Sequence, residues 1–331
     1  MKIVICDYKE PLNRDLNREI SFFKEGLDDD TEVVVYEYKN DVNELKSVIA
    51  DADGILTSYL EFPKDVIDST KQLKIISIEA TGYNFVDADA ASKKGVGVCV
   101  IGEYCTQEVA DHTITLMLAV ARNLKHYRNQ IEVCHKYDYN SISGMFRLEG
   151  SVLGILGLGK IGKAVAKRAQ GFGLKVIAYS PSCKKEAADA LGVTLVSLEE
   201  LYETSNIITV NMRLTDDNVG MLDYNAFCKM KQKPVIVNVS RGAMIVEQDL
   251  VRALDEGLIF GAGLDVLETE TDEETTVNPL VGRENVVITP HMAFYSDTAL
   301  YECQRIASQN LVHYLNGAYD KVFRMVNQVE K

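Results

Sequence analysis

Short apolar runs alternate along this chain with longer stretches in which apolar residues recur every three or four positions. The short runs predict strands, at 2–8, 32–38, 54–58, 74–80, 97–101, 152–156, 175–179, 207–212, 234–240, 261–267 and 285–289. The longer stretches predict helices, for example at 42–50, 87–94, 161–171, 247–256 and 297–316. Regular alternation of strands and helices predicts an α/β fold with parallel sheets.

The longest helical stretch covers 106–127, where Val109, Leu116 and Val120 belong to one apolar face. Basic side chains gather near its end, where cations complement the dipole of a helix. The polar stretch 137–150 shows neither the helical nor the strand period. It predicts an irregular connection into the next strand.

Composition bounds the size and the partners of the protein. Of its 331 residues, 47% are hydrophobic and 25% are charged, which are ordinary values for a globular protein of about two domains. The 49 acidic and 35 basic residues give a net charge of −14, which disfavours nucleic acid as a partner. A small anionic substrate stays open, because one local arginine outweighs distant carboxylates.

Cysteine usage and hydropathy point to a compartment. The seven cysteines are scattered and form no C-x-x-C pair, which favours reduced thiols over disulfides and disfavours a metal site. No apolar run reaches the ~18–20 residues of a membrane span, and the first residues do not read as a signal peptide. We therefore expect a cytoplasmic protein with no membrane partner.

A glycine-rich segment directly follows the predicted strand 152–156. Gly157, Gly159 and Gly162 have the G-x-G-x-x-G spacing, and a predicted helix follows them. In a dinucleotide-binding turn the first glycine permits a tight turn, the second admits a pyrophosphate, and the third lets helix and strand pack closely. The helix N-terminus then offers N–H groups to the phosphates. The segment predicts dinucleotide binding, with Lys160 and Ile161 as further contacts.

The next strand ends where many NAD enzymes place an acidic residue that binds the ribose hydroxyls. This chain has Ser180 there, followed by Ser182 and Lys184. Without a carboxylate, a 2′-phosphate meets no repulsion, and Ser182 or Lys184 could contact it. The residues thus slightly favour NADP(H) over NAD(H), the alternative being an NAD enzyme that manages without the acid.

Three later strands end in residues that can carry chemistry. Arg241 follows the strand at 234–240, Glu270 lies beyond the strand at 261–267, and His291 follows the strand at 285–289. Each alone could be an ordinary strand end. Ligands of open α/β sheets bind at the carboxyl ends of the strands, so the three together indicate an active site.

With these motifs, the whole chain resembles the D-isomer-specific 2-hydroxyacid dehydrogenase family. The matching motifs are the glycine fingerprint, N-x-S-R-G at 238–242, G-L-D-V-x-x-x-E at 263–270 and T-P-H at 289–291. The resemblance implies two Rossmann-like or flavodoxin-like domains with parallel sheets and an active site in the cleft between them. It implies a coenzyme domain at 102–295, inserted into a substrate domain made of 1–101 and 296–331.

The resemblance also implies roles for the three strand-end residues. Arg241 would hold the substrate carboxylate and polarise its carbonyl through forked hydrogen bonds. His291 would be the general acid–base that exchanges a proton with the carbonyl oxygen. Glu270 would pair with this histidine and orient its ring.

Other positions match family segments for the substrate and the coenzyme. Thr81 and Gly82 lie in a loop whose backbone N–H groups bind the substrate carboxylate in relatives. Val239 and Asp265 match residues of the coenzyme region. Relatives commonly have His-x-Pro near the adenine, whereas this chain has Asn211 followed by Met212 and Arg213. The extra positive charge of Arg213 again suggests NADP, although Arg213 could be a surface residue.

The signals for substrate disagree within one class of reaction. Tyr295, in an aromatic pair after the histidine, and Tyr104 resemble positions of the D-lactate and D-2-hydroxyisocaproate branch. The loop 80–87 is more similar to hydroxypyruvate and glycerate enzymes. Phosphite dehydrogenases carry a lysine where Thr81 stands, which argues against that chemistry.

The sequence thus predicts an NAD(P)-dependent oxidoreductase that interconverts a D-2-hydroxy acid and its 2-oxo acid. Members of the family are typically dimers through the coenzyme domain, so we expect a homodimer. The rival hypothesis is a dinucleotide-sensing binding protein similar to the carboxy-terminal-binding corepressors, with little turnover. The segment 103–111 resembles those proteins, but the complete Arg–Glu–His set favours the enzyme.

Overall fold

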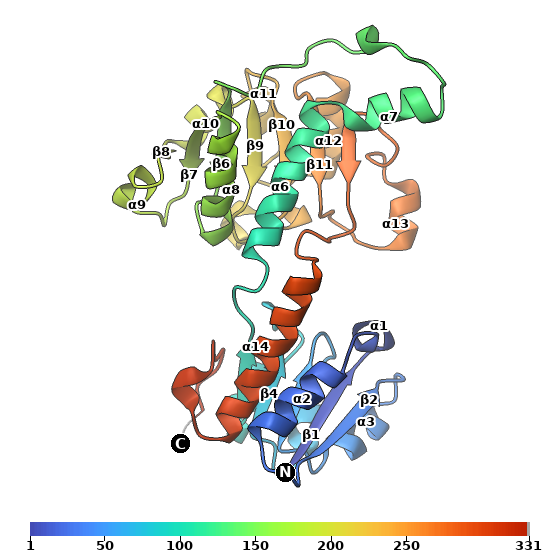
Figure 1. Cartoon of the computed structure of the whole chain (residues 1–331), viewed down its shortest axis with the longest axis vertical. Coiled ribbons are helices and arrows are strands. Elements are labelled where there is room, and N and C mark those ends of the chain that lie inside the picture. The colour runs from blue at the N-terminus through green and yellow to red at the C-terminus, as the bar shows by residue number, and fades with distance from the viewer. Residues whose placement is uncertain (330–331) are drawn as a thin grey trace. The chain divides into compact units, whose positions relative to one another are not determined.

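The computed structural model describes residues 1–329 and divides the chain into two compact units (Figure 1). Unit 1 contains Met1–Tyr104 and the segment that begins at Ser296, and unit 2 contains Cys105–Tyr295. Each unit is built on one sheet in which all strands are parallel. The predicted α/β class with two parallel sheets is therefore confirmed.

The sheet of unit 1 has the strand order β2-β1-β3-β4-β5. Its strands are β1 (Lys2–Asp7), β2 (Glu32–Glu37), β3 (Gly54–Thr57), β4 (Ile75–Ile78) and β5 (Gly97–Val100). The order reverses between β1 and β3. In doubly wound sheets this switch point opens a crevice at the carboxyl ends of the strands, where ligands bind.

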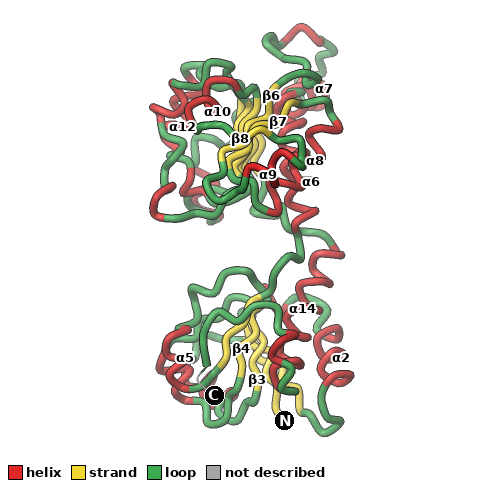
Figure 2. The backbone as a smooth tube through the Cα atoms, turned by 90° about the vertical axis from the view of Figure 1, so that its left-hand side faces the viewer, coloured by secondary structure: helices red, strands yellow, loops and turns green. Residues whose placement is uncertain are grey.

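Helices cover both faces of this sheet (Figure 2). The helices of unit 1 are α1 (Lys9–Leu12), α2 (Asn17–Gly26), α3 (Val42–Ile49), α4 (Lys64–Ser69), α5 (Ala88–Lys94) and α14 (Asp297–Leu315), with a 3-10 turn η4 (Tyr319–Lys321). Phe23 of α2 and Leu311 of α14 are fully buried in the core on one face. Leu45 of α3 and Ile67 of α4 belong to the core on the other. The strands are therefore buried on both sides, which explains their continuous apolar sequences.

The sheet of unit 2 has the strand order β12-β11-β10-β9-β6-β7-β8. Its strands are β6 (Val152–Leu156), β7 (Lys175–Tyr179), β8 (Thr194–Leu195), β9 (Ile207–Val210), β10 (Val235–Asn238), β11 (Gly261–Leu264) and β12 (Val286–Ile288). The two-residue strand β8 was not predicted, because it is too short to show a period. The order reverses between β6 and β9, as in dinucleotide-binding sheets.

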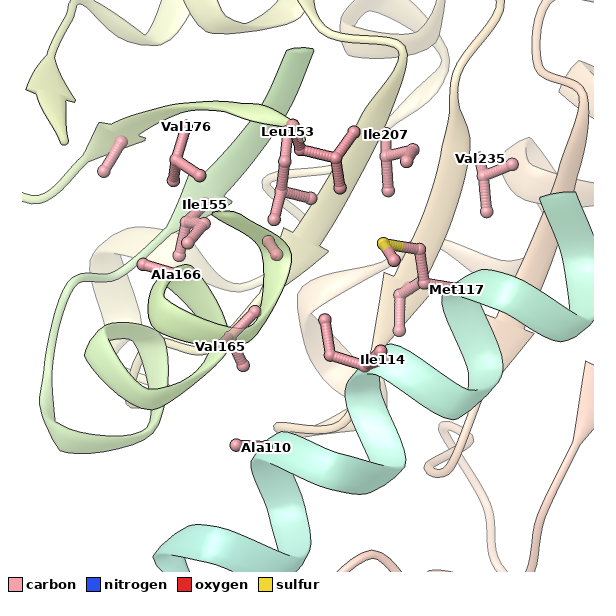
Figure 3. Packing of buried hydrophobic residues seen from close by; sticks show 14 of the residues in the cluster. Ala110, Ile114, Met117, Leu153, Ile155, Val165, Ala166, Val176, Ile207 and Val235 are labelled. Atoms are coloured by element: carbon pink, nitrogen blue, oxygen red, sulfur yellow. The ribbon is translucent and has the colours of Figure 1, made fainter. Parts of the chain in front are cut away.

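Two helices pack their apolar faces against one side of this sheet (Figure 3). They are α6 (Thr106–Ala121) and α8 (Lys160–Gly171). Ile114 and Met117 of α6 point toward the strands, as does Val165 of α8. The remaining helical elements are α7 (Leu124–Glu132), η1 (Tyr139–Ser141), α9 (Lys185–Asp189), α10 (Leu198–Thr204), η2 (Asp216–Asn218), α11 (Tyr224–Cys228), η3 (Gly242–Met244), α12 (Glu247–Asp255) and α13 (Asp272–Val277). Within residues 1–329, no helix has the length and apolar character needed to cross a membrane.

The single helix predicted at 106–127 is wrong, because the structure breaks it in two. Helix α6 ends at Ala121, and Asn123 adopts a left-handed conformation with φ 49° before α7 begins. Asparagine tolerates this conformation better than most residues. Basic residues such as Lys125 therefore do not cap the longer helix, and Lys125 Nζ instead donates to the carbonyls of Arg283 and Val286 at 2.7 and 2.8 Å.

The acidic run 268–274 differs in part from the solvated loop that its composition predicts. Thr271 caps helix α13 by accepting a hydrogen bond from the N–H of Glu274, and acidic side chains fill the first turn. Carboxylates there complement the helix dipole. The end of the run, Asp272 to Glu274, is therefore helical, although the run stays mostly exposed.

Candidate active site

The glycine turn of unit 2 has the geometry that its motif predicts. Gly157 has φ +94°, a conformation in which a side chain is strained. A Cβ on Gly157 would lie 2.5 Å from Met212 Cβ, and one on Gly162 would lie 2.1 Å from the carbonyl oxygen of Gly157. Only glycine lets the turn, β9 and α8 approach so closely.

Gly159 faces open space instead. A Cβ on this residue would meet nothing within 4 Å, and the residue caps α8 without a side-chain hydrogen bond. The first turn of α8, with Lys160 and the half-buried Ile161, therefore starts beside space that a phosphate can enter. Its N–H groups and dipole favour an anion, so the residues present fit a dinucleotide.

The residues expected around the adenosine lie at the ends of β7 and β9. Ser180 is half-buried and accepts a 3.0 Å hydrogen bond from the N–H of Cys183, which forms a turn. Ser182, Lys184 and Arg213 are exposed. This surface carries hydroxyl and cationic groups without a carboxylate at the first position after β7.

The loop after β10 presents Arg241. Asn238 Nδ2 donates to the Arg241 carbonyl at 3.0 Å, and Arg241 Nη1 donates to the Ser240 carbonyl at 2.7 Å. A Cβ on Gly242 would lie 1.9 Å from the Leu267 carbonyl oxygen, so glycine lets this loop touch the loop after β11. The exposed guanidinium of Arg241 therefore stands on a fixed backbone.

Asp265 organises the loop after β12. It is 1% exposed, and its carboxylate accepts hydrogen bonds from the N–H groups of Met292 at 2.9 Å and Ala293 at 2.8 Å and from the Thr289 hydroxyl. His112 Nε2 of α6 lies 3.4 Å from the same carboxylate. Burial tends to raise the pKa of Asp265, but the hydrogen bonds from His112, Thr289 and the backbone together lower it.

His291 sits on the backbone that Asp265 holds. Its N–H donates to the Asp265 carbonyl at 2.8 Å, and its φ of 49° lies in the left-handed region. A residue keeps such a conformation only where its surroundings enforce it. His291 Nδ1 lies 2.8 Å from Glu270 Oε2, and both side chains are 43% exposed. This contact occupies Nδ1, and Nε2 is the ring nitrogen that does not face Glu270.

A cavity of about 480 Å³ lies beside this pair within unit 2. His291, Glu270 and Asp265 line it, together with Thr271 and Lys125 among others. Titratable groups thus converge on a concave site large enough for a small molecule.

Sequence reasoning missed two supports of this site. His112 Nε2 lies 2.9 Å from Thr289 Oγ1, although 177 positions separate the two residues. Both groups reach Asp265. A half-buried histidine among the apolar positions of 106–127 was the signal that could have indicated such a contact.

The predicted substrate residues are divided between the units. Thr81 and Gly82 are exposed in the loop after β4 of unit 1. Tyr104 also belongs to unit 1, where it packs against the core formed with α2 and α14. Tyr295 is the last residue of unit 2, is 56% exposed and lies edge-to-face with Phe294. Val239, in contrast, packs against the core of unit 2.

We expect Asp265→Asn to destabilise unit 2 by about 2–3 kcal/mol at pH 7. An asparagine amide would place N–H donors opposite N–H donors in a buried site, and charge-assisted hydrogen bonds are worth about 1.5–3 kcal/mol. Because folding lowers the pKa of Asp265, its stabilisation is present above the unfolded value of 3.8 and fades as the pH falls further. Urea unfolding followed by circular dichroism at pH 7 and at a pH well below 3.8 measures both effects.

Asp255→Asn is the matched control, because Asp255 forms an exposed ion pair with Arg283 at 2.7 Å. This variant should unfold almost as the wild type does. Equal stability of the two variants at pH 7 would contradict the anchoring role of Asp265.

Comparison with known proteins decides the family. The model of the D-isomer specific 2-hydroxyacid dehydrogenase NAD-binding domain matches residues 114–293, more than half of the chain. The chain belongs to the D-isomer-specific 2-hydroxyacid dehydrogenase family. This dehydrogenase is therefore an oxidoreductase of 2-hydroxy acids, and its matched domain lies inside unit 2.

Relatives and solved structures agree with this assignment. The hydroxypyruvate reductase of Blautia hydrogenotrophica is 35% identical over 300 residues, which are 88% of this chain and 92% of the relative. The D-lactate dehydrogenase of Aquifex aeolicus, solved with NAD and lactic acid, superimposes with a TM-score of 0.81 at 25% identity, covering 99% of this chain and 100% of that one. An acyclic imino acid reductase solved with NADPH and D-Arg superimposes with a TM-score of 0.81 at 26% identity. The match covers 98% of this chain and 100% of the reductase.

Other relatives are longer than this dehydrogenase. The D-3-phosphoglycerate dehydrogenase of Methanocaldococcus jannaschii is 35% identical over 83% of this chain, but the match spans only 52% of that protein. The named relatives are dehydrogenases and reductases, so the comparisons do not favour the corepressor alternative.

Proposed function

We propose that this chain interconverts a D-2-hydroxy acid and its 2-oxo acid by hydride transfer, with His291 as the general acid–base. The observation that carries the proposal is the 2.8 Å contact between His291 Nδ1 and Glu270, on a loop fixed by Asp265 in the same unit as the glycine turn. A carboxylate on Nδ1 selects the tautomer and orients the ring, as in other acid–base pairs.

The roles of the side chains follow from the chemistry of the substrate. In reduction, His291 donates a proton to the carbonyl oxygen, and in oxidation it removes the proton from the hydroxyl. Glu270 balances the positive charge that His291 carries between these steps. Arg241 offers a forked donor to the substrate carboxylate and carbonyl, which a single ammonium group does not.

We propose that NAD(P)(H) binds at the glycine turn, with NADP(H) slightly favoured. When bound, the coenzyme supplies or accepts the hydride. Open space beside Gly159 and the N-terminus of α8 suit the pyrophosphate. The absence of an acid at Ser180, and the exposed Ser182, Lys184 and Arg213, would accommodate a 2′-phosphate.

We further propose that residues 102–295 form the coenzyme domain and that 1–101 with 296–331 form the substrate domain. Thr81 and Gly82 would bind the substrate carboxylate through backbone N–H groups, and Tyr104 and Tyr295 would contact the rest of the substrate. Val239 and Asp265 would lie next to the coenzyme, Asp265 through the loop that it anchors.

We propose a homodimer in the cytoplasm. The segment between α7 and β6 exposes apolar side chains, with Val133 69% and Tyr139 82% exposed, which a second copy could cover. The apolar face of α6 is already buried within unit 2 and is not available for this purpose. Cys6, Cys99, Cys134, Cys183 and Cys228 are free thiols, which supports a reducing compartment.

A steady-state assay tests the function. Pyruvate, 2-oxoisocaproate, phenylpyruvate, glyoxylate and hydroxypyruvate are offered in parallel with NADH and NADPH, and coenzyme oxidation is followed by absorbance. We expect turnover of at least one 2-oxo acid and a higher kcat/KM with NADPH. Turnover with NADH alone would overturn the coenzyme preference, and no turnover on any substrate would overturn the function.

A further inference from the structure

Unit 1 buries a group of charged side chains at the carboxyl ends of its strands. We call it the Arg14 cluster: Arg14 precedes α2, Glu19 lies on α2, and Glu79 directly follows β4. Arg14 Nε lies 2.7 Å from Glu19 Oε1, and Arg14 Nη2 lies 2.6 Å from Glu79 Oε2. The side chains of Glu19 and Glu79 are 0% and 3% exposed. Two buried carboxyls thus share one guanidinium.

The surroundings of Glu79 make its second charge costly. The charged and titratable groups that face it are Arg14 and Glu19 of α2, and the Cys303 thiol of α14 donates to the Glu79 carbonyl. The Asp7 carboxylate of β1 interacts with Arg14 and adds a further negative charge to the cluster. Strand β3 contributes the Ser58 hydroxyl, which donates to Glu79 Oε2 at 3.2 Å. If every carboxyl were ionised, three negative charges would face one positive charge in a buried site.

A proton on Glu79 reduces this imbalance. Glu79 Oε1 and Glu19 Oε2 are both buried, and neither meets a donor among residues 1–329. The two carboxyls are within hydrogen-bonding reach of each other, a contact that requires one of them to carry a proton. Burial, reinforced by Glu19 and opposed by Arg14, raises the pKa of Glu79 to about 8.

We propose that Glu79 is a positioning residue whose protonation sets the affinity of the adjoining loop Ala80–Asn84 for the substrate carboxylate. This inference rests on the proposed function, in which Thr81 and Gly82 of that loop bind the carboxylate. Neutral Glu79 removes one negative charge from the residue directly before the loop. Ionised Glu79 places a carboxylate two residues before Thr81, in a poorly screened environment where it repels an anionic substrate.

The test compares the pH dependence of KM in wild type and Glu79→Gln. The glutamine imitates the neutral carboxyl at every pH, so the ratio of the wild-type KM to the variant KM isolates the titration of Glu79. With hydroxypyruvate as substrate, we expect this ratio to be constant below about pH 7 and to rise up to about tenfold for each pH unit above the inflection near 8. The kcat ratio should stay flat, because Glu79 touches no reacting atom.

Two neighbouring variants should move the inflection in opposite directions. Glu19→Gln removes the charge that raises the pKa of Glu79 and should lower the inflection, whereas Ser58→Ala removes a hydrogen bond to the carboxylate and should raise it. Glu25→Gln, an exposed change on the same helix α2, should reproduce the wild-type profile. A KM ratio that does not change with pH would overturn the proposal.

Thermal unfolding reports the protonation of Glu79 in the absence of a substrate. Because folding raises the pKa of Glu79 from 4.5, wild type should lose Tm relative to Glu79→Gln as the pH rises from about 5 to 8, and the difference should then stay level. If this difference appears but no 2-oxo acid is turned over at any pH, the proposed function fails and the titration of Glu79 stands. If turnover occurs and the Tm difference is constant, the proposal for Glu79 fails alone.

Discussion

His291→Gln is expected to lower kcat for 2-oxo acid reduction by about 100- to 10,000-fold, the usual contribution of a general acid–base. Glutamine can keep a hydrogen bond to Glu270, but it cannot deliver a proton to the carbonyl oxygen. The affinity for the coenzyme should persist, because the glycine turn after β6 is untouched. Steady-state kinetics measures kcat, and quenching or enhancement of reduced-coenzyme fluorescence measures binding.

The chain offers a control with the same backbone conformation. His135 is exposed in unit 2 and has φ 52°, close to the 49° of His291. His135→Gln therefore makes the same chemical change at a similarly strained position and should keep wild-type kcat. A fully active His291→Gln enzyme would refute the acid–base role. Loss of activity in both variants would instead show that the loss is not specific to the acid–base role of His291.

Arg241→Lys is expected to lower kcat/KM by about 10- to 150-fold. Lysine keeps the charge but loses the planar fork, and one hydrogen bond to a charged group is worth about 1.5–3 kcal/mol. Most of the loss should fall on kcat if the guanidinium also polarises the carbonyl in the transition state. The measurement is steady-state kinetics over a range of 2-oxo acid concentrations.

Arg128→Lys is the control for this substitution. Arg128 forms a surface ion pair with Glu132 on α7, and its side chain is 75% exposed. The control should match the wild type in both kcat and KM. Unchanged kcat/KM in Arg241→Lys would remove this residue from the substrate site, while a loss in KM alone would limit its role to binding.

Much of the fold follows from local patterns. Continuous apolar runs predicted most of the strands, because parallel strands are covered on both faces and their apolar character shows in the local sequence. The ends were less accurate: the run at 261–267 becomes the shorter strand Gly261–Leu264. The end of a strand depends on the hydrogen bonds that its neighbours offer. The N–H of Asp265 still donates to the Asn238 carbonyl, but the Asp265 side chain anchors the loop after β12, and the strand ends at Leu264.

The break at Asn123 shows a second limit of periodicity. The apolar spacing continues through 106–127, so no local signal distinguishes one long helix from two. The tertiary structure decides because the segment after Asn123 turns to place Lys125 on the carbonyls of Arg283 and Val286. His126 likewise meets Glu284 in this turned helix.

The sequence by itself determined the α/β class, the glycine turn and the strand-end residues Arg241, Glu270 and His291, because each depends on short-range spacing and on the rule that parallel strands present their carboxyl ends together. Only the tertiary structure decided how these groups are held. His112 supports Thr289 from 177 positions away, and Arg14 of unit 1 meets Glu79, which lies far along the chain from it. Burial and electrostatic balance arise from such distant neighbours, and a linear pattern does not contain them.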